Sequence, residues 1–314
     1  MIADKDELSL KDLLRYIWEH ILLIVLTVLA GGVCFYMAAS FIMKPQYVSD
    51  IKFSVYTRPA EQVGPVGSIQ ADTLLVQDYA VVIRSRTVAQ AVIKELQLMK
   101  DGQPMAPADL MEKVVVDPGD GTSRMITVSI VHEDPFLAAD IADEYAEAAI
   151  QTIKDSYGVN NISIVDHANV PLERYSPNTF LFVLLGIILG LACGCLILTL
   201  LYMIEDDKTI FRFMAGAAAL LLVVFVAISG ILYARSDRKG PEITFNSDHP
   251  LYDGLNTTLL LTDVTAVDET DGDVSDTLRI KSLMETEDEI LVIYMAKDQS
   301  SNITEKSRHI QKNE

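Results

Sequence analysis

The residues best suited to acid–base or metal chemistry are scattered along this sequence of 314 residues. None of its histidines falls in an HExxH or related metal spacing; they are His20, His132, His167, His249 and His309. The GxSxG and GxxxxGK[ST] motifs are absent as well. Asp166 and His167 are adjacent, but neighbouring residues on a strand point to opposite faces, so a structural histidine is the better interpretation. The sequence therefore predicts a protein that is not an enzyme and that has no cofactor.

A run of carboxylates near the C-terminus offers one alternative, a Ca²⁺ site. Ca²⁺ prefers several carboxylate oxygens, and this run supplies them from Asp268, Glu269, Asp271, Asp273 and Asp276. The spacing does not match an EF-hand. Asp-rich segments of this kind also form turns, in which the side chains accept hydrogen bonds from the backbone. We interpret the run as a solvated turn and predict no metal.

The composition excludes several classes of protein. With 44 acidic and 25 basic side chains the net charge is −19, which disfavours nucleic-acid binding because neutralising phosphates needs a basic face. Half of the residues are hydrophobic although only 7% are aromatic, which points to a membrane protein. The three cysteines, Cys34, Cys193 and Cys195, lie in apolar segments, so no disulfide framework is predicted.

Three apolar segments are long enough to cross a bilayer, which takes about 20 residues. We predict membrane helices over residues 18–43, 177–204 and 213–234. The first is interpreted as a retained anchor, because the preceding residues mix acidic and basic side chains and its apolar run is longer than that of a signal peptide.

Three crossings place residues 44–176 and 235–314 on one side and the segments 1–17 and 205–212 on the other. Lysine and arginine counts do not decide the orientation. The acidic residues do: residues 44–176 carry 19 acidic and 11 basic side chains, and residues 240–314 carry 16 and 6. An anionic inner leaflet would repel such surfaces. We therefore predict a multi-pass protein of the plasma membrane with both large parts extracytoplasmic.

The larger outer part, residues 44–176, reads as a mixed α/β domain. Ile51, Phe53 and Val55 alternate with polar residues, as do Ile126, Val128 and Ile130, which predicts two strands. Ser85 or Thr87 is a candidate cap for a helix. Asp134-Pro135 is a strong helix start, and that helix can run to Tyr157. Residues 161–165 follow as a returning strand.

The C-terminal part, residues 235–314, reads as a small all-β sandwich. Strands are predicted over 256–267, 290–294 and 302–310. Val264–Ser275 and Tyr294–Asp298 with Asn302 resemble bacterial immunoglobulin-like repeats. In two places the sequence departs from that pattern: Glu285–Glu289 replaces a glycine ahead of the tyrosine strand, and Ser301 stands where glycine is common.

Several motifs in order resemble Wzz-type chain-length determinants, over about residues 8–208. They are Leu10–Trp18 before the first membrane helix, Val82–Val88 on a helix, Asp134-Pro135 with Ala138–Ala142, and Val165–Ala168 followed by Pro171, Ser176, Pro177 and Asn178. The resemblance implies a non-enzymatic polysaccharide co-polymerase. Such a protein is a homo-oligomer that works with the polymerase and flippase machinery and sets the chain length or export of a capsular, exo- or O-antigen-type polysaccharide.

In some relatives a separate cytoplasmic tyrosine kinase is a further partner. Glu205, Asp206 and Asp207 resemble the start of the cytoplasmic segment that would contact it, although the third membrane helix follows within a few residues.

Glycines recur in the first two predicted membrane helices. Gly186, Gly190 and Gly194 are spaced by four residues, and Gly31 and Gly32 are candidates to receive them. Small residues let membrane helices approach closely, either within one chain or between subunits. Ordinary membrane glycines without a packing role are the alternative.

Two other functions remain open from the sequence. One is a surface-binding or adhesion receptor that reuses a Wzz-like stalk. The other is a membrane sensor that modulates a separate tyrosine kinase.

Overall fold

The computed structural model describes residues 18, 20–56, 65–119, 123–204, 208–246, 257–286 and 289–311. They form two compact units. A helical unit comprises Met1–Pro45 and Tyr175–Ser236, and a mixed unit comprises Gln46–Arg174 and Asp237–Glu314.

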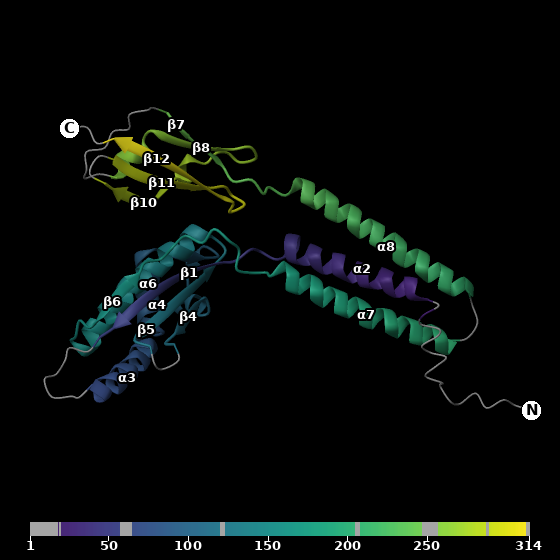
Figure 1. Ribbon diagram of the computed structural model, residues 1–314, viewed down its shortest axis with the longest axis horizontal. Coiled ribbons are helices and arrows are strands. Elements are labelled where there is room, and N and C mark those ends of the chain that lie inside the picture. Colours follow the sequence, from purple (N-terminus) through teal and green to yellow (C-terminus); the bar gives the residue numbers. More distant parts are fainter. Residues whose placement is uncertain are drawn as a thin grey trace, which may run out of the picture. The chain divides into compact units, whose positions relative to one another are not determined.

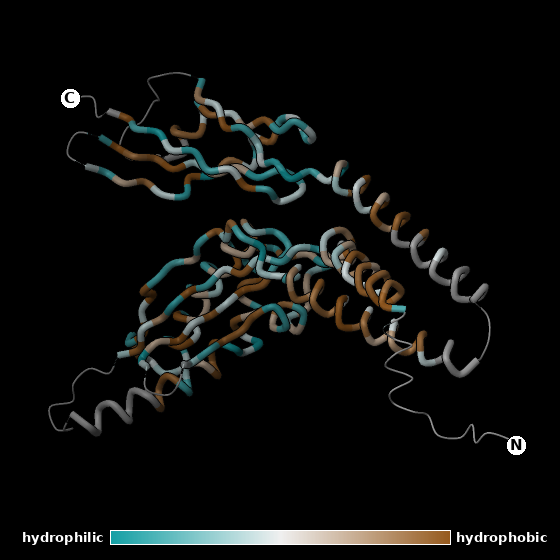
Figure 2. Tube along the Cα trace, turned by 45° about the vertical axis from the view of Figure 1, so that its right-hand side comes forward, coloured by the Kyte–Doolittle hydropathy of each residue, from teal (hydrophilic) through white to brown (hydrophobic). Residues whose placement is uncertain are grey.

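The described part of the helical unit is built from long helices (Figure 1). α2 (Ile21–Met37) continues into a π-helical turn over Ala38–Ile42, and α7 (Thr179–Ile204) packs along it. Ile21–Ile42 and Thr179–Thr199 are long and apolar enough to cross a membrane, and Figure 2 shows both as hydrophobic. α8 (Lys208–Arg235) also packs against α2 and contains the third predicted segment, but its described apolar stretch is the shorter Val223–Arg235.

A four-stranded antiparallel sheet forms the centre of the α/β domain, which we define as residues 46–174. Its strand order is β4 (Val114–Asp117), β5 (Met125–His132), β1 (Tyr47–Val55) and β6 (Ile162–Asp166). Ile51 lies opposite Val128 and Phe53 opposite Ile126, as expected for two alternating strands that bury one face. A short hairpin, β2 (Met99–Lys100) and β3 (Gln103–Pro104), lies apart from this sheet.

Helices cover the apolar face of this sheet: α3 (Pro65–Ile83), α4 (Arg86–Glu95), α5 (Pro107–Met111) and α6 (Pro135–Tyr157). Of the two predicted caps Ser85 is the one used, and its hydroxyl accepts a bond from the Val88 amide. Residues 82–88 were predicted to lie on one helix, and this is wrong. α3 ends at Ile83, and Ser85 caps the start of α4. The buried Tyr145 hydroxyl donates to the Ile83 carbonyl oxygen at 2.9 Å and so ties α6 to the end of α3.

The C-terminal module, residues 237–311, consists of two three-stranded antiparallel sheets. One is β7 (Glu242–Phe245), β8 (Val264–Asp268) and β9 (Gly272–Asp273). The other is β10 (Arg279–Glu285), β11 (Glu289–Lys297) and β12 (Ile303–Gln311). Both sheets contribute to one core, with Ile243 and Ala266 from the first and Val292 and Tyr294 from the second. The all-β prediction is correct at this level.

The strand boundaries of the module differ from the prediction. Thr257–Leu261 form a 3-10 helix instead of the start of a strand, because Leu260 turns into the core and its carbonyl accepts a bond from the Tyr294 hydroxyl. β10 ends at Glu285 and β11 begins at Glu289, and the two strands pair antiparallel. The prediction included part of β11 but not β10. Ser301 adopts a positive φ of 62°, the conformation for which glycine is common there.

Candidate functional site

The predicted glycines lie where α2 packs against α7. A Cβ added to Gly31 would overlap the Gly186 carbonyl oxygen, and one added to Gly190 would lie 2.9 Å from the Val28 Cα. Gly32 is less constrained, since its added Cβ would meet only the Ile187 side chain at 3.5 Å. Gly194 faces the Thr27 side chain. The structure thus brings these glycines together in a close helix pair within one chain.

The other predicted site residues lie near the start and end of α7. Ser176-Pro177 is a cis peptide, and Asn178 caps α7 by accepting a bond from the Leu181 amide at 3.3 Å. Pro171 is half-buried just before this segment. The candidate partner contact at positions 205–207 lies outside the described residues.

The acidic run of the C-terminal module is divided by the structure. Asp268 and Asp271 meet Asp237 and Asp298, with carboxylate oxygens within 4.8 Å of one another. The other acidic residues of the run are not in this group. Glu269 pairs with Lys239 at 3.0 Å, Asp273 accepts a bond from Ser275 at 2.6 Å, and Asp276 lines a cavity described below. The amides of Thr270 and Asp271 donate to Asp268, which lowers the pKa of that carboxyl. These bonds are those of a turn.

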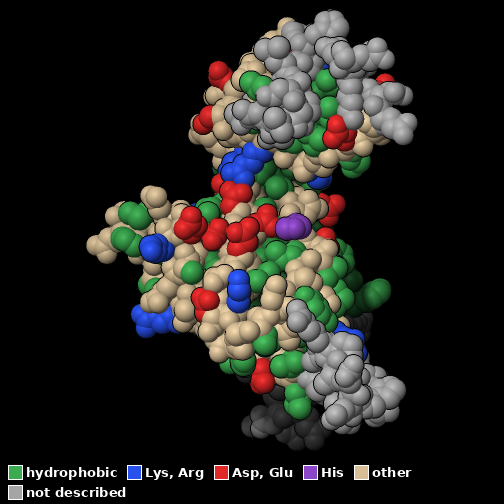
Figure 3. Space-filling model, turned by 90° about the vertical axis from the view of Figure 1, so that its left-hand side faces the viewer, with side chains coloured by type: hydrophobic (Ala, Val, Ile, Leu, Met, Phe, Trp, Pro, Cys, Tyr) green, Lys and Arg blue, Asp and Glu red, His purple; other side chains and the backbone are tan. Residues whose placement is uncertain are grey.

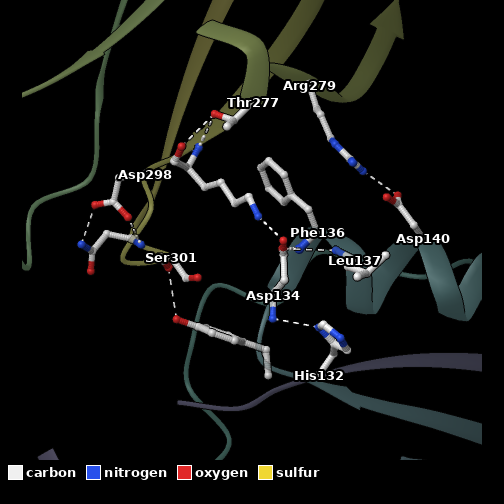
Figure 4. A network of polar contacts seen from close by, with 12 residues as sticks. His132, Asp134, Phe136, Leu137, Asp140, Thr277, Arg279, Asp298 and Ser301 are labelled. Carbon is white, nitrogen blue, oxygen red and sulfur yellow. Dashed lines mark hydrogen bonds and ion pairs between the residues drawn. The ribbon is translucent and has the colours of Figure 1, made fainter. Parts of the chain in front are cut away.

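A site that the sequence did not predict lies at the start of α6, in the mixed unit (Figure 4). Asp134 is the predicted cap, and one of its oxygens accepts bonds from the amides of Phe136 and Leu137 at 2.9 and 3.3 Å. Its other oxygen pairs with Lys297, at the end of β11 in the C-terminal module. A single side chain therefore both caps a helix and binds the module.

Phe136 is the centre of this contact and is only 2% exposed. The Arg279 guanidinium lies 4.8 Å from the centroid of its ring and the Lys297 ammonium 5.3 Å, so two cations of the module contact one aromatic ring. Arg279 also pairs with Asp140, one turn further along α6, at 2.5 Å. We call Arg279, Lys297 and Phe136, with their two aspartates, the cation clamp.

The module holds the clamp in place with its own backbone. The Thr277 hydroxyl accepts a bond from the Lys297 amide at 3.1 Å and lies 2.8 Å from the Lys297 carbonyl oxygen. Beyond Lys297, the buried Tyr47 hydroxyl of β1 donates to the Ser301 carbonyl oxygen at 3.1 Å. The positive φ of Ser301 lies in the turn that presents this oxygen.

The electrostatics of the site favour an ionised Asp134 and a neutral His132. Burial raises the pKa of Asp134, but the hydrogen bond and charge of Lys297, with the two helix amides, outweigh it, and the pKa lies below its usual value. Burial and the Lys113 charge lower the pKa of His132, whose Nδ1 accepts a bond from the Asp134 amide at 2.9 Å. The bonds that Asp134 and His132 make position the start of α6.

A cavity of about 490 Å³ lies beside the cation clamp. It is lined by residues of the α/β domain and of the module, among them His132, Glu133, Asp273, Asp276 and Gln299. Acidic side chains gather on this face of the mixed unit (Figure 3). The contact is therefore polar and partly open, unlike the cores on either side of it.

In sequence order, the α/β domain lies between two helices that are long and apolar enough to cross a membrane. Residues 6–96 match the family model described as Wzz, chain length determinant protein. The chain is similar to capsular polysaccharide biosynthesis protein CpsC of Streptococcus agalactiae, with 27% identity over 202 residues, 64% of this chain and 85% of that protein. CpsC of Streptococcus pneumoniae is also 27% identical over 202 residues, 63% of this chain and 85% of that protein. The probable capsular polysaccharide biosynthesis protein YwqC of Bacillus subtilis is 27% identical over 187 residues, 59% of this chain and 73% of that protein.

The family match and the named relatives confirm the resemblance to Wzz-type chain-length determinants that the ordered motifs predicted. The role of this chain therefore lies in polysaccharide biosynthesis, at the step that determines chain length.

Proposed function

We propose that this protein is a non-enzymatic co-polymerase that regulates the chain length of a capsular-type polysaccharide. The observation that carries the proposal is the match to the Wzz family over residues 6–96, in a chain whose α/β domain lies between two membrane-length helices. The names of the relatives CpsC and YwqC support the capsular class of product. The catalytic work would fall to a separate polymerase.

Deleting the gene and sizing the surface polysaccharide by gel electrophoresis tests this function. The deletion strain should lose its characteristic length distribution, and a plasmid copy should restore it. An unchanged distribution in the deletion strain would contradict the proposal and would favour an adhesion or sensor role instead.

We further propose a three-pass topology, with α8 as the third crossing and both the α/β domain and the C-terminal module outside. The 28-residue length of α8 and the acidic balance of the two outer parts support it. The module would then be an immunoglobulin-like domain at the outer face of the plasma membrane, close to the α/β domain.

The partners of the proposed assembly are further copies of this chain and the polymerase and flippase machinery. A separate tyrosine kinase would bind the cytoplasmic segment that contains Glu205, Asp206 and Asp207. Replacing these three acids by lysine should abolish co-purification of such a kinase while membrane insertion is unaffected. Equal recovery of the kinase with the native protein and with the variant would show that this segment does not bind the kinase.

A further inference from the structure

We propose that the start of α6 is a docking surface for the C-terminal module of the same chain, which binds it reversibly through the cation clamp. This interaction lies outside the chain-length function proposed above and does not depend on it. The chemistry of the contact defines the partner. The module contributes two cations, Arg279 and Lys297, and the capped start of α6 contributes an aromatic ring and two carboxylates.

The charges of the two parts make this contact selective. Residues 44–176 and 240–314 carry net charges of −8 and −10, so the two bodies repel each other unless cations are concentrated where they meet. Only six basic residues lie in 240–314. Arg279 and Lys297 are two of them, and both contact α6.

Other cations of the module are used within it. Lys281 pairs with Glu305 at 2.5 Å, Lys306 donates to the Ile243 carbonyl oxygen at 2.6 Å, and Arg308 pairs with Asp263 at 3.2 Å. The two cations of the clamp are thus distinguished from these by their partners rather than by their exposure.

The contact is built to separate without unfolding either part. Among the described residues, the α/β domain and the module have distinct hydrophobic cores that share no buried residue. The described contacts between them are the ion pairs, the cations against the Phe136 ring, the Tyr47–Ser301 bond and the polar cavity. Polar contacts between domains of one chain are typical of interfaces that open and close.

Hydroxyl-radical footprinting of the full chain in lipid nanodiscs tests the proposal, because it reports the exposure of individual side chains. Arg279→Glu should give a severalfold increase in oxidation of Phe136 and Tyr47. The matched control is Lys281→Glu, which makes the same charge change on the same strand but disrupts a pair inside the module, and it should leave both side chains protected. Phe53 and Tyr294, fully buried in the two cores, must stay protected in every variant and so report intact folds.

Charge reversal distinguishes the partner. In one chain, Arg279→Glu with Asp140→Arg should restore protection of Phe136. Nanodiscs that contain one chain with Arg279→Glu and one with Asp140→Arg should not restore it, because each module docks on its own domain. Restoration in that mixture would show exchange between copies, and equal effects of the Arg279 and Lys281 variants would show a general charge effect; either result overturns the proposal. If Arg279→Glu unfolds the module, Asp140→Arg alone, which changes only α6, should expose Phe136, and continued protection would overturn it.

Discussion

Asp134 combines two functions that usually belong to different side chains. One oxygen satisfies amides at the start of α6 and the other binds Lys297 of the module. A helix N-terminus repels cations through its dipole, so the carboxylate is what allows Lys297 to approach. This combination separates experimentally, because asparagine can cap a helix and alanine cannot.

Asp134→Asn should expose Phe136 while the first turn of α6 stays ordered. Asp134→Ala should expose Phe136 and also disorder the first turn of α6, because the lost cap destabilises the helix by about 1 kcal/mol. Hydrogen exchange at the Phe136 and Leu137 amides measures this second effect. Identical exchange in the two variants would show that the carboxylate has no capping role separate from its binding of Lys297.

Acid should release the module through the same residue. Because the pKa of Asp134 is lowered in the folded protein, its stabilising effect is present above the usual aspartate pKa of about 3.9 and is lost as the pH falls through the lower, folded value. Asp298 has the opposite sign, since burial raises its pKa, so it does not account for a loss of stability in acid. Oxidation of Phe136 should therefore rise below about pH 4 in the native chain and show no such step with Asp134→Asn.

At the scale of elements, glycine determines how closely two helices approach. Gly31, Gly186 and Gly190 occupy positions where any side chain meets the backbone of the partner helix. Gly230 of α8 has the same residue type, yet an added Cβ there would contact no described atom within 4 Å. The two kinds of glycine provide a matched comparison.

Gly190→Leu should separate α2 from α7, lower the thermal midpoint of the purified protein and shift the polysaccharide length distribution. Gly230→Leu should leave all of these unchanged. If both variants behave like the native chain, the close contact of the two helices has no role in assembly or function.

Much of the α/β domain was predictable from its residues, and the boundaries of the module were not. Period-two alternation identified β1 and β5, and Asp134-Pro135 identified α6 together with its end at Tyr157. The segment at 257–261 reads as a strand because local propensity favours it, but burial of Leu260 under Tyr294 decides for a 3-10 turn. The cation clamp joins residues more than 130 positions apart, a contact that no local pattern encodes.

At the scale of the whole molecule, the proposed division of work is that the helices and the α/β domain set chain length while the module is accessory. A stop codon after Ser236 should then preserve the length distribution and change retention of the polysaccharide at the cell surface. Loss of length control in this strain would place the module in the central mechanism.

Topology belongs to the same scale. In a chain whose three cysteines are replaced by alanine, single cysteines at Asp101 and Ser300 should both react with an impermeant maleimide on intact cells, and one at Thr209 should react only after lysis. Labelling of only one of the first two would exclude the three-pass arrangement.

The separate cores of the α/β domain and the module have a consequence for cooperativity. Because the described cores share no residue, each part can unfold as its own cooperative block. The free energy of the contact between the two parts is what couples their unfolding. In calorimetry of the native chain the two transitions should overlap. Weakening the contacts of the cation clamp should lower the midpoint temperature of the less stable part and so separate the two transitions. A single surface substitution would then change the number of heat-absorption peaks.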